Sequence, residues 1–106
     1  MSNRVRMRDV YEVPIDERDL LDMSTIHDYL RVTLGFPEHY GKNLSALYDC
    51  LGDICEHTRL YVMRDATMDP DSDYAQQMDR LCMVLMRAAR ENPWLSVSIS
   101  TIRWPE

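Results

Sequence analysis

Glycine is scarce in this chain, which has only three among its 106 residues. The three lie far apart, at positions 35, 41 and 52. A phosphate-binding loop needs closely spaced glycines, because its backbone N–H groups must approach the anion without side chains in the way. The sequence therefore offers no glycine-rich loop for a nucleotide.

Long apolar runs are also absent. No stretch approaches the roughly 20 apolar residues of a membrane-spanning helix. The first residues, MSNRVRMRDVYEVP, have neither the apolar segment nor the small-residue cleavage site of a signal peptide. We therefore expect the chain to stay in the cytoplasm.

Cysteine occurs three times, at Cys50, Cys55 and Cys82, with no metal-type spacing. In a reducing compartment these should be free thiols. Cys50 and Cys82 fall on apolar helical stretches, where a small buried hydrophobic side chain is the usual role. We expect no metal and no cofactor.

Basic side chains are outnumbered, because 12 Lys and Arg face 18 Asp and Glu, for a formal charge of −6. This balance argues against a duplex-binding module, which needs a basic surface. It suits a basic protein partner. The length and a 45% hydrophobic share predict one globular domain.

The first half of the chain reads as a strand followed by a helix. Alternating apolar and charged residues predict a strand within 4–13, and 14–22 reads as a polar connection. Ser24 is expected to cap a helix that runs to about Leu34. Gly35 then stands where a helix-ending glycine belongs.

The second half repeats the alternation of strand and helix. The apolar run 60–63 predicts a short strand buried on both faces, and 65–72 reads as a loop. Helical spacing covers 73–91, and alternation over 95–100 predicts a strand with one buried face. The complete order, with a further helix after residue 43, predicts an α/β fold with a small three-stranded parallel sheet packed by helices.

Residues 36–54, FPEHYGKNLSALYDCLGDI, combine a turn, a helix start and a two-faced helix. Gly41 is the residue of this loop that we expect to adopt a positive φ. Asn43 is a suitable N-cap. A helix from there places one apolar stripe on its back, made of Leu44, Leu47, Leu51 and Ile54. Its front carries Ser45, Tyr48, Asp49, Gly52 and Asp53.

Catalytic and metal-binding patterns are weak. Cys50 or Cys55 could be imagined as a nucleophile with His57 as its base, but nothing in the sequence fixes their geometry. His27 borders an apolar stripe and is expected to be structural. The acidic clusters at 69/71/73 and 16/17/19 suggest calcium at first sight, yet the first lacks the glycine and distal glutamate of an EF-hand loop. We expect both to be solvated loops.

The run PEHYGKNLSALYDCL, residues 37–51, resembles the signature of the barstar family of intracellular ribonuclease inhibitors. Weaker agreement extends from about Tyr11 to Thr101, and residues 1–10 look like an N-terminal extension of one barstar-like domain spanning 1–106. The resemblance implies the same α/β fold. It also implies an inhibitor, not an enzyme, whose helix and loop plug a ribonuclease active site.

The same resemblance assigns a partner-binding surface. It implies that Asp49 takes the position of an RNA phosphate among the cations of a ribonuclease. Tyr48 stands where the family has a tryptophan, and Glu56 matches an acidic residue on the rim. The full set of expected partner-binding residues is His39, Tyr40, Gly41, Asn43, Ser45, Ala46, Tyr48, Asp49, Gly52, Asp53 and Glu56.

Departures from the family pattern predict a target other than barnase, the family's ribonuclease. His39 replaces a tyrosine, Lys42 a glutamate and Ser45 an aspartate, while Ala88 falls near another lost glutamate. The central carboxylate, Asp49, is thus present, while much of the acidic surface that surrounds it in the family is lost. The expected partner is a basic nuclease, such as a ribonuclease toxin, bound 1:1 by a monomeric immunity protein or antitoxin.

Two alternatives stay open at the level of sequence. The same helix face could serve an interaction module whose partner is not a nuclease, since a scaffold does not dictate function. An RNA-binding or catalytic protein is the other alternative, and the net charge of −6 argues against it.

Overall fold

The computed structural model describes residues 5–7, 10–20 and 22–103. Its strands are β1 (Val5–Met7), β2 (Val10–Asp16), β3 (Thr58–Asp65) and β4 (Leu95–Ile102). Its helices are α1 (Met23–Leu34), α2 (Leu44–Gly52) and α3 (Asp73–Glu91). The strands form one sheet in the order β1-β2-β3-β4.

The sheet combines the expected parallel strands with one short addition. β2, β3 and β4 pair in parallel, which confirms the α/β prediction of three parallel strands packed by helices. β1 pairs antiparallel with β2, from Val5 opposite Glu12 to Met7 opposite Val10. It lies in the segment predicted as an N-terminal extension, while residues 4, 8 and 9 of the predicted strand lie outside the described residues.

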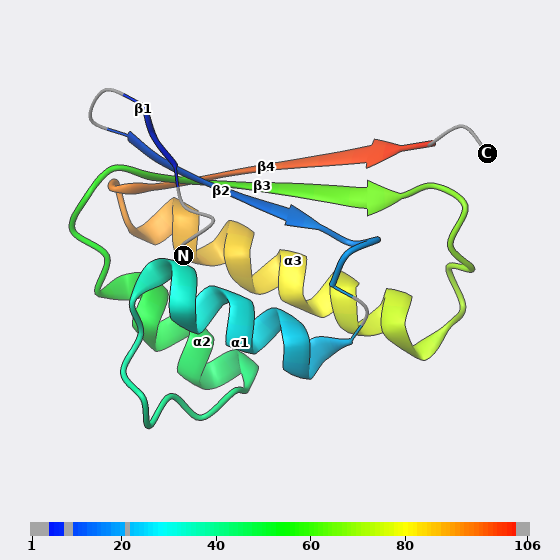
Figure 1. The fold of residues 1–106 in the computed structure, drawn as a ribbon, viewed down its shortest axis with the longest axis horizontal. Coiled ribbons are helices and arrows are strands. Elements are labelled where there is room, and N and C mark those ends of the chain that lie inside the picture. The colour runs from blue at the N-terminus through cyan, green and yellow to red at the C-terminus, as the bar shows by residue number, and fades with distance from the viewer. Residues whose placement is uncertain (1–4, 8–9, 21, 104–106) are drawn as a thin grey trace.

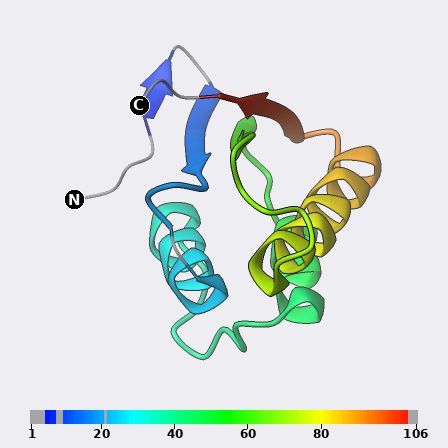
Figure 2. The same ribbon diagram turned by 90° about the vertical axis from the view of Figure 1, so that its right-hand side faces the viewer.

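The helices α1, α2 and α3 lie together on one face of the sheet (Figures 1 and 2). Both parallel crossovers step across the sheet in the same direction, from β2 to β3 and from β3 to β4. Crossovers of one handedness that step the same way place their helices on the same face. None of the helices in the described part of the chain covers the other face of the sheet.

The structure corrects two sequence predictions about strands. β3 is longer than 60–63 and is buried on one face only, because Leu60 and Val62 are buried while Tyr61 and Met63 are partly exposed. β2 continues through Pro14, which was predicted to begin a connection. Among the described residues β1 pairs only as far as Glu12, so Pro14 stands at a locally open edge, where its missing N–H costs no ladder bond.

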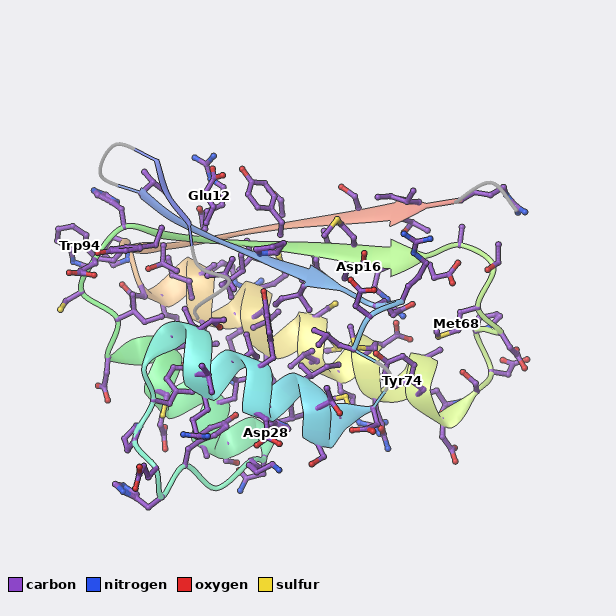
Figure 3. The ribbon with its side chains drawn as sticks, viewed as in Figure 1. Glu12, Asp16, Asp28, Met68, Tyr74 and Trp94 are labelled. Carbon is purple, nitrogen blue, oxygen red and sulfur yellow. The ribbon has the colours of Figure 1, made fainter. Side chains whose placement is uncertain are left out.

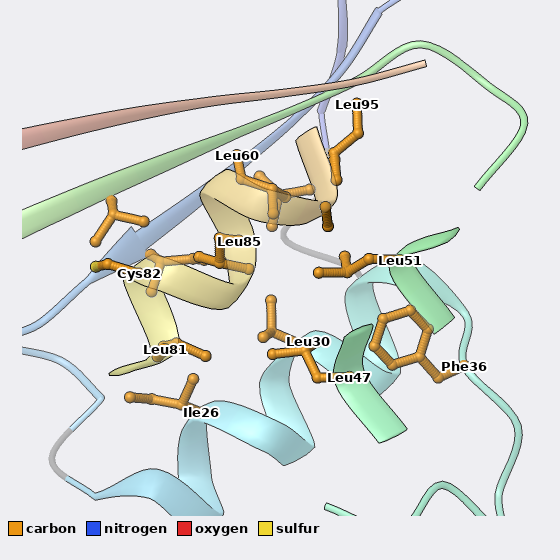
Figure 4. Close-up of a cluster of buried hydrophobic side chains, with 14 of the residues drawn as sticks. Ile26, Leu30, Phe36, Leu47, Leu51, Leu60, Leu81, Cys82, Leu85 and Leu95 are labelled. Carbon is orange, nitrogen blue, oxygen red and sulfur yellow. The ribbon is translucent and has the colours of Figure 1, made fainter. Parts of the chain in front are cut away.

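The hydrophobic core lies between the sheet and the three helices (Figure 4). Ile26 and Leu30 of α1 meet Leu81 and Leu85 of α3, and all four are fully buried. The helix ends follow local rules: Gly35 closes α1 at φ 72° and Asn43 caps α2 as expected. Asp22, not Ser24, caps α1, since its side chain accepts from the backbone N–H of Thr25.

Candidate partner-binding site

Helix α2 presents its two faces as the sequence predicted. Leu47 and Leu51 are completely buried against the core. Asp49 and Asp53 are exposed on the opposite side, and Tyr48 between the faces is half-buried. The helix stops at Gly52, so Ile54 of the predicted stripe lies just beyond it, partly buried. The carboxylate of Asp49 thus points to solvent from a helix whose back is anchored.

The start of α2 is fixed by Asn43. Its Oδ1 accepts from the backbone N–H of Ala46 at 2.8 Å, and its Nδ2 donates to the carbonyl of Gly41 at 3.2 Å. A cap of this kind typically stabilises a helix by about 1 kcal/mol. The side chain of Asn43 is therefore engaged with the backbone on both sides of the helix start.

The loop before α2 differs from the prediction at one position. Lys42, not Gly41, adopts the left-handed conformation, at φ 54°. Its ammonium group donates to Ser24 Oγ at 2.8 Å and pairs with Asp28 Oδ1 at 3.1 Å, so contacts with α1 hold it there. Gly41 instead allows a close approach, because a Cβ on it would stand 3.0 Å from Nδ2 of Asn43 and would press on the capping side chain.

Tyr40 secures the same loop from inside. It is only 7% exposed, its hydroxyl lies 2.6 Å from Nδ1 of His27, and its ring packs on Phe36. His27 is buried, which agrees with the structural role expected for it, and burial lowers its pKa. Of the expected partner-binding residues, Tyr40 thus acts mainly as a support, while its neighbour His39 is exposed.

Helix α3 adds side chains to this surface that the sequence analysis did not identify. The guanidinium of Arg87 lies over the ring of Tyr48, 5.1 Å from its centroid. Arg87 also pairs loosely with Glu91, one turn further on, at 3.8 Å. Nothing local in the sequence signals the Arg87–Tyr48 contact, because it joins two helices. Of the other expected residues, Ser45, Gly52 and Glu56 are exposed and Ala46 is half-buried.

A groove of about 690 Å³ lies beside Asp49, between the ends of α2 and α3. Trp94, just after α3, lines it (labelled in Figure 3). Its ring contacts that of His57 in a tilted arrangement, with centroids 4.7 Å apart and planes at 54°. The lining of the groove includes Tyr48, Asp49, Asp53, Cys55, Glu91, Asn92 and Trp94. We call this feature the Asp49–Trp94 groove.

The geometry gives no support to a cysteine nucleophile. Cys50, Cys55 and Cys82 are free thiols, and the ring of His57 contacts that of Trp94. Burial raises the pKa of the Cys50 thiol, and the carboxylates of Asp53 and Asp49 raise it further, which disfavours the reactive thiolate. Within residues 5–7, 10–20 and 22–103, no three His, Cys, Asp or Glu side chains are grouped to hold a metal ion.

One acidic cluster behaves differently from its prediction. Glu17, expected in a solvated loop, is 1% exposed and pairs with Arg64 of β3. Arg64 also pairs with Asp79 of α3 at 2.9 Å. The cluster at 16/17/19 therefore contributes a buried ion pair to the fold. None of the helices in the described part of the chain has both the length and the apolar character that a membrane span requires.

The chain is similar to known proteins. The family model described as "Barstar (barnase inhibitor)" matches residues 10–97. A protein of Bacillus subtilis strain 168, named "Putative ribonuclease inhibitor YrdF", is 48% identical over 40 residues. That match covers 38% of this chain and 44% of the relative.

Proposed function

The chain belongs to the Barstar family, and from that premise we propose that it is a protein inhibitor of a ribonuclease and not an enzyme. The observation that carries the proposal is the exposed carboxylate of Asp49, on a helix whose opposite side is fully buried. A ribonuclease holds the scissile phosphate with arginine, lysine and histidine side chains. A carboxylate inserted among them accepts the same charge-assisted hydrogen bonds as the phosphate.

Rigidity of the presenting elements supports this role. Asn43 caps the helix, and Lys42 ties the preceding loop to Ser24 and Asp28 of α1. The buried Tyr40–His27 pair holds the middle of the loop. An inhibitor built this way loses little conformational entropy when it binds. Its affinity is higher because that cost is avoided.

The surroundings of Asp49 suit a basic partner. Ser45, Gly52 and Asp53 share its exposed face, with His39, Gly41 and Asn43 at one end and Glu56 near the other. The net charge of −6 would accelerate association with a cationic nuclease. We propose a 1:1 complex in the cytoplasm, in which the chain acts as an immunity protein or antitoxin against a ribonuclease toxin.

Affinity capture with matched baits tests the proposal. Extract from the native host is passed over immobilised wild-type protein, Asp49→Ala and Asp19→Ala. The last variant removes an exposed carboxylate from the loop after β2. The captured protein is then purified and assayed on RNA, with barnase as a second, known ribonuclease.

We expect the wild type and Asp19→Ala to capture and inhibit a ribonuclease. Asp49→Ala should bind it at least about 100-fold more weakly, because the nuclease cations are left buried without their anion. A captured partner that does not cleave RNA would indicate an interaction module of another kind and overturn the proposal. Equal inhibition by Asp49→Ala would overturn the phosphate mimicry.

A further inference from the structure

The Asp49–Trp94 groove extends the exposed face of α2 toward a corner of the molecule that the proposed function leaves unused. Asp49 and Asp53 line its α2 side. Glu91 and Trp94 line the side formed by the end of α3 and the turn into β4. The groove is thus continuous with the proposed partner-binding surface.

Asn92 makes the far wall of the groove rigid. This residue is 6% exposed, and its Nδ2 donates to the carbonyls of Leu51 at 2.9 Å and Ile54 at 3.0 Å. Its Oδ1 accepts from the backbone N–H of Trp94 at 2.9 Å. One side chain therefore fastens the end of α2 to the turn that carries Trp94.

Trp94 is held in place and yet presents a large surface. Its carbonyl accepts from the N–H of Thr58 at 2.8 Å, and its ring makes a tilted contact with that of His57. The residue is nevertheless 43% exposed. A tryptophan fixed by its backbone and by a ring contact can bind a partner at little entropic cost, which is the usual character of an interface anchor.

The charges in the groove have one sign. Asp49, Asp53 and Glu91 contribute three carboxylates, and no lysine or arginine is among the described residues that line it. Arg87 lies beside the groove, in a smaller adjoining recess that shares Tyr48 and Asp49 with it, and its guanidinium pairs with Glu91 at 3.8 Å. Because both side chains of that pair are more than half exposed, the pair is weak and leaves Glu91 able to accept a second cation. The groove therefore combines anions with the aromatic rings of Tyr48 and Trp94.

We propose that the groove receives an arginine side chain of the bound ribonuclease, with Trp94 as its aromatic wall and Glu91 and Asp53 as its anions. This inference rests on the proposed function and extends its surface from α2 to the end of α3. Arginine fits better than lysine because its planar cation stacks on aromatic rings and forms two parallel hydrogen bonds to a carboxylate.

A small-molecule titration tests the ligand chemistry without the nuclease. The probe is Nα-acetyl-arginine methylamide, and its control is the citrulline analogue, which has nearly the same shape and no charge. Binding is followed by ¹H–¹⁵N NMR on the wild type and on Trp94→Leu, Trp94→Phe and Glu91→Gln. Thermal unfolding of each variant shows whether it is folded.

We expect the arginine probe to shift the signals of Trp94, Asp53 and Glu91, and the citrulline probe to leave them unchanged. Trp94→Leu should weaken the response about three- to fivefold, and Trp94→Phe should restore part of it. Equal responses to both probes, or shifts scattered over the surface, would overturn the proposal.

The complex provides the second arm. Trp94→Leu and Glu91→Gln should each weaken inhibition of the captured ribonuclease, and the wild-type complex should protect Cys55, which is exposed beside the groove, from alkylation. If Asp49→Ala abolishes inhibition while both groove variants retain it, the groove proposal is wrong and the proposed function stands. If the groove responds specifically to arginine but no ribonuclease is captured, the proposed function is wrong. In that case the arginine does not come from a nuclease either.

Discussion

Nδ1 of His27 lies 2.6 Å from the hydroxyl of Tyr40, and both side chains are buried between α1 and the loop that leads to α2. Burial raises the pKa of Tyr40 well above its ordinary value, so its hydroxyl keeps its proton. A neutral His27 can accept that proton in a hydrogen bond. A protonated His27 cannot, because both of its ring nitrogens are then donors.

The first prediction is that acid weakens the fold through His27. Burial lowers the pKa of His27 from 6.5, and the nearby Lys42 lowers it further, so the unfolded chain binds the proton more readily. Stability from this group should therefore be complete above about pH 6.5 and should fall as the pH decreases below that value. Urea unfolding at pH 7.5, 6.0 and 5.0 measures the change.

His39 provides the control for this prediction. It is exposed on the same loop, so His39→Gln should leave the pH dependence unchanged. His27→Gln should flatten it and lower stability at pH 7.5. An identical pH profile for His27→Gln and the wild type would show that other groups control acid stability.

The second prediction concerns the buried ion pair of Glu17 and Arg64. Arg64→Met would leave the Glu17 carboxylate, at 1% exposure, without its cation, although the backbone N–H of Asp65 still donates to it at 3.1 Å. The expected loss is about 3–5 kcal/mol of unfolding free energy. Thermal and urea unfolding measure it, and Arg80→Met, on the exposed side of α3, should change stability by less than about 0.5 kcal/mol.

Features that depend on nearby residues could be predicted from the sequence. The register of α2 was predicted correctly because its determinants are local: leucines at helical spacing and Asn43 at the cap. The position of Asp49 on the exposed side follows directly from that register. The parallel strand order was also accessible, since strands joined by helices have few alternatives.

The errors arose where distant contacts decide the local structure. Lys42 takes the left-handed conformation expected of Gly41, and its ammonium group contacts Ser24 and Asp28 of another helix. Glu17 is buried with Arg64 as its partner, and because that partner lies 47 residues away in sequence, no local pattern indicated the pair. The groove escaped prediction for the same reason, because its two sides come from α2 and from the end of α3. The extent of the domain and the partner-binding roles remain predictions.

The third prediction is an order of cysteine reactivity. Cys55 is exposed, Cys50 is partly buried and Cys82 is buried, and burial raises the thiol pKa of the latter two. Because the thiolate is the reactive form, iodoacetamide at pH 8 should modify Cys55 first and Cys82 last. Peptide mass spectrometry over a time course measures the order. Modification of Cys82 in step with Cys55 would mean that the core around α3 opens on the timescale of the reaction.

The last prediction is that Asn92 joins α2 to the turn after α3. Asn92→Ala would remove the donor to the Leu51 and Ile54 carbonyls and the acceptor for the Trp94 N–H. We expect a loss of about 2–3 kcal/mol, because these backbone groups lie at a largely buried junction. Urea unfolding measures this loss, with Ser96→Ala, exposed on β4, as the control that should change little.

Asn92→Ala should also release Trp94, so the indole signal of Trp94 in ¹H–¹⁵N spectra should broaden or move toward that of a free side chain. Loss of stability without any change at Trp94 would show that His57 and the Thr58 hydrogen bond are enough to hold the ring.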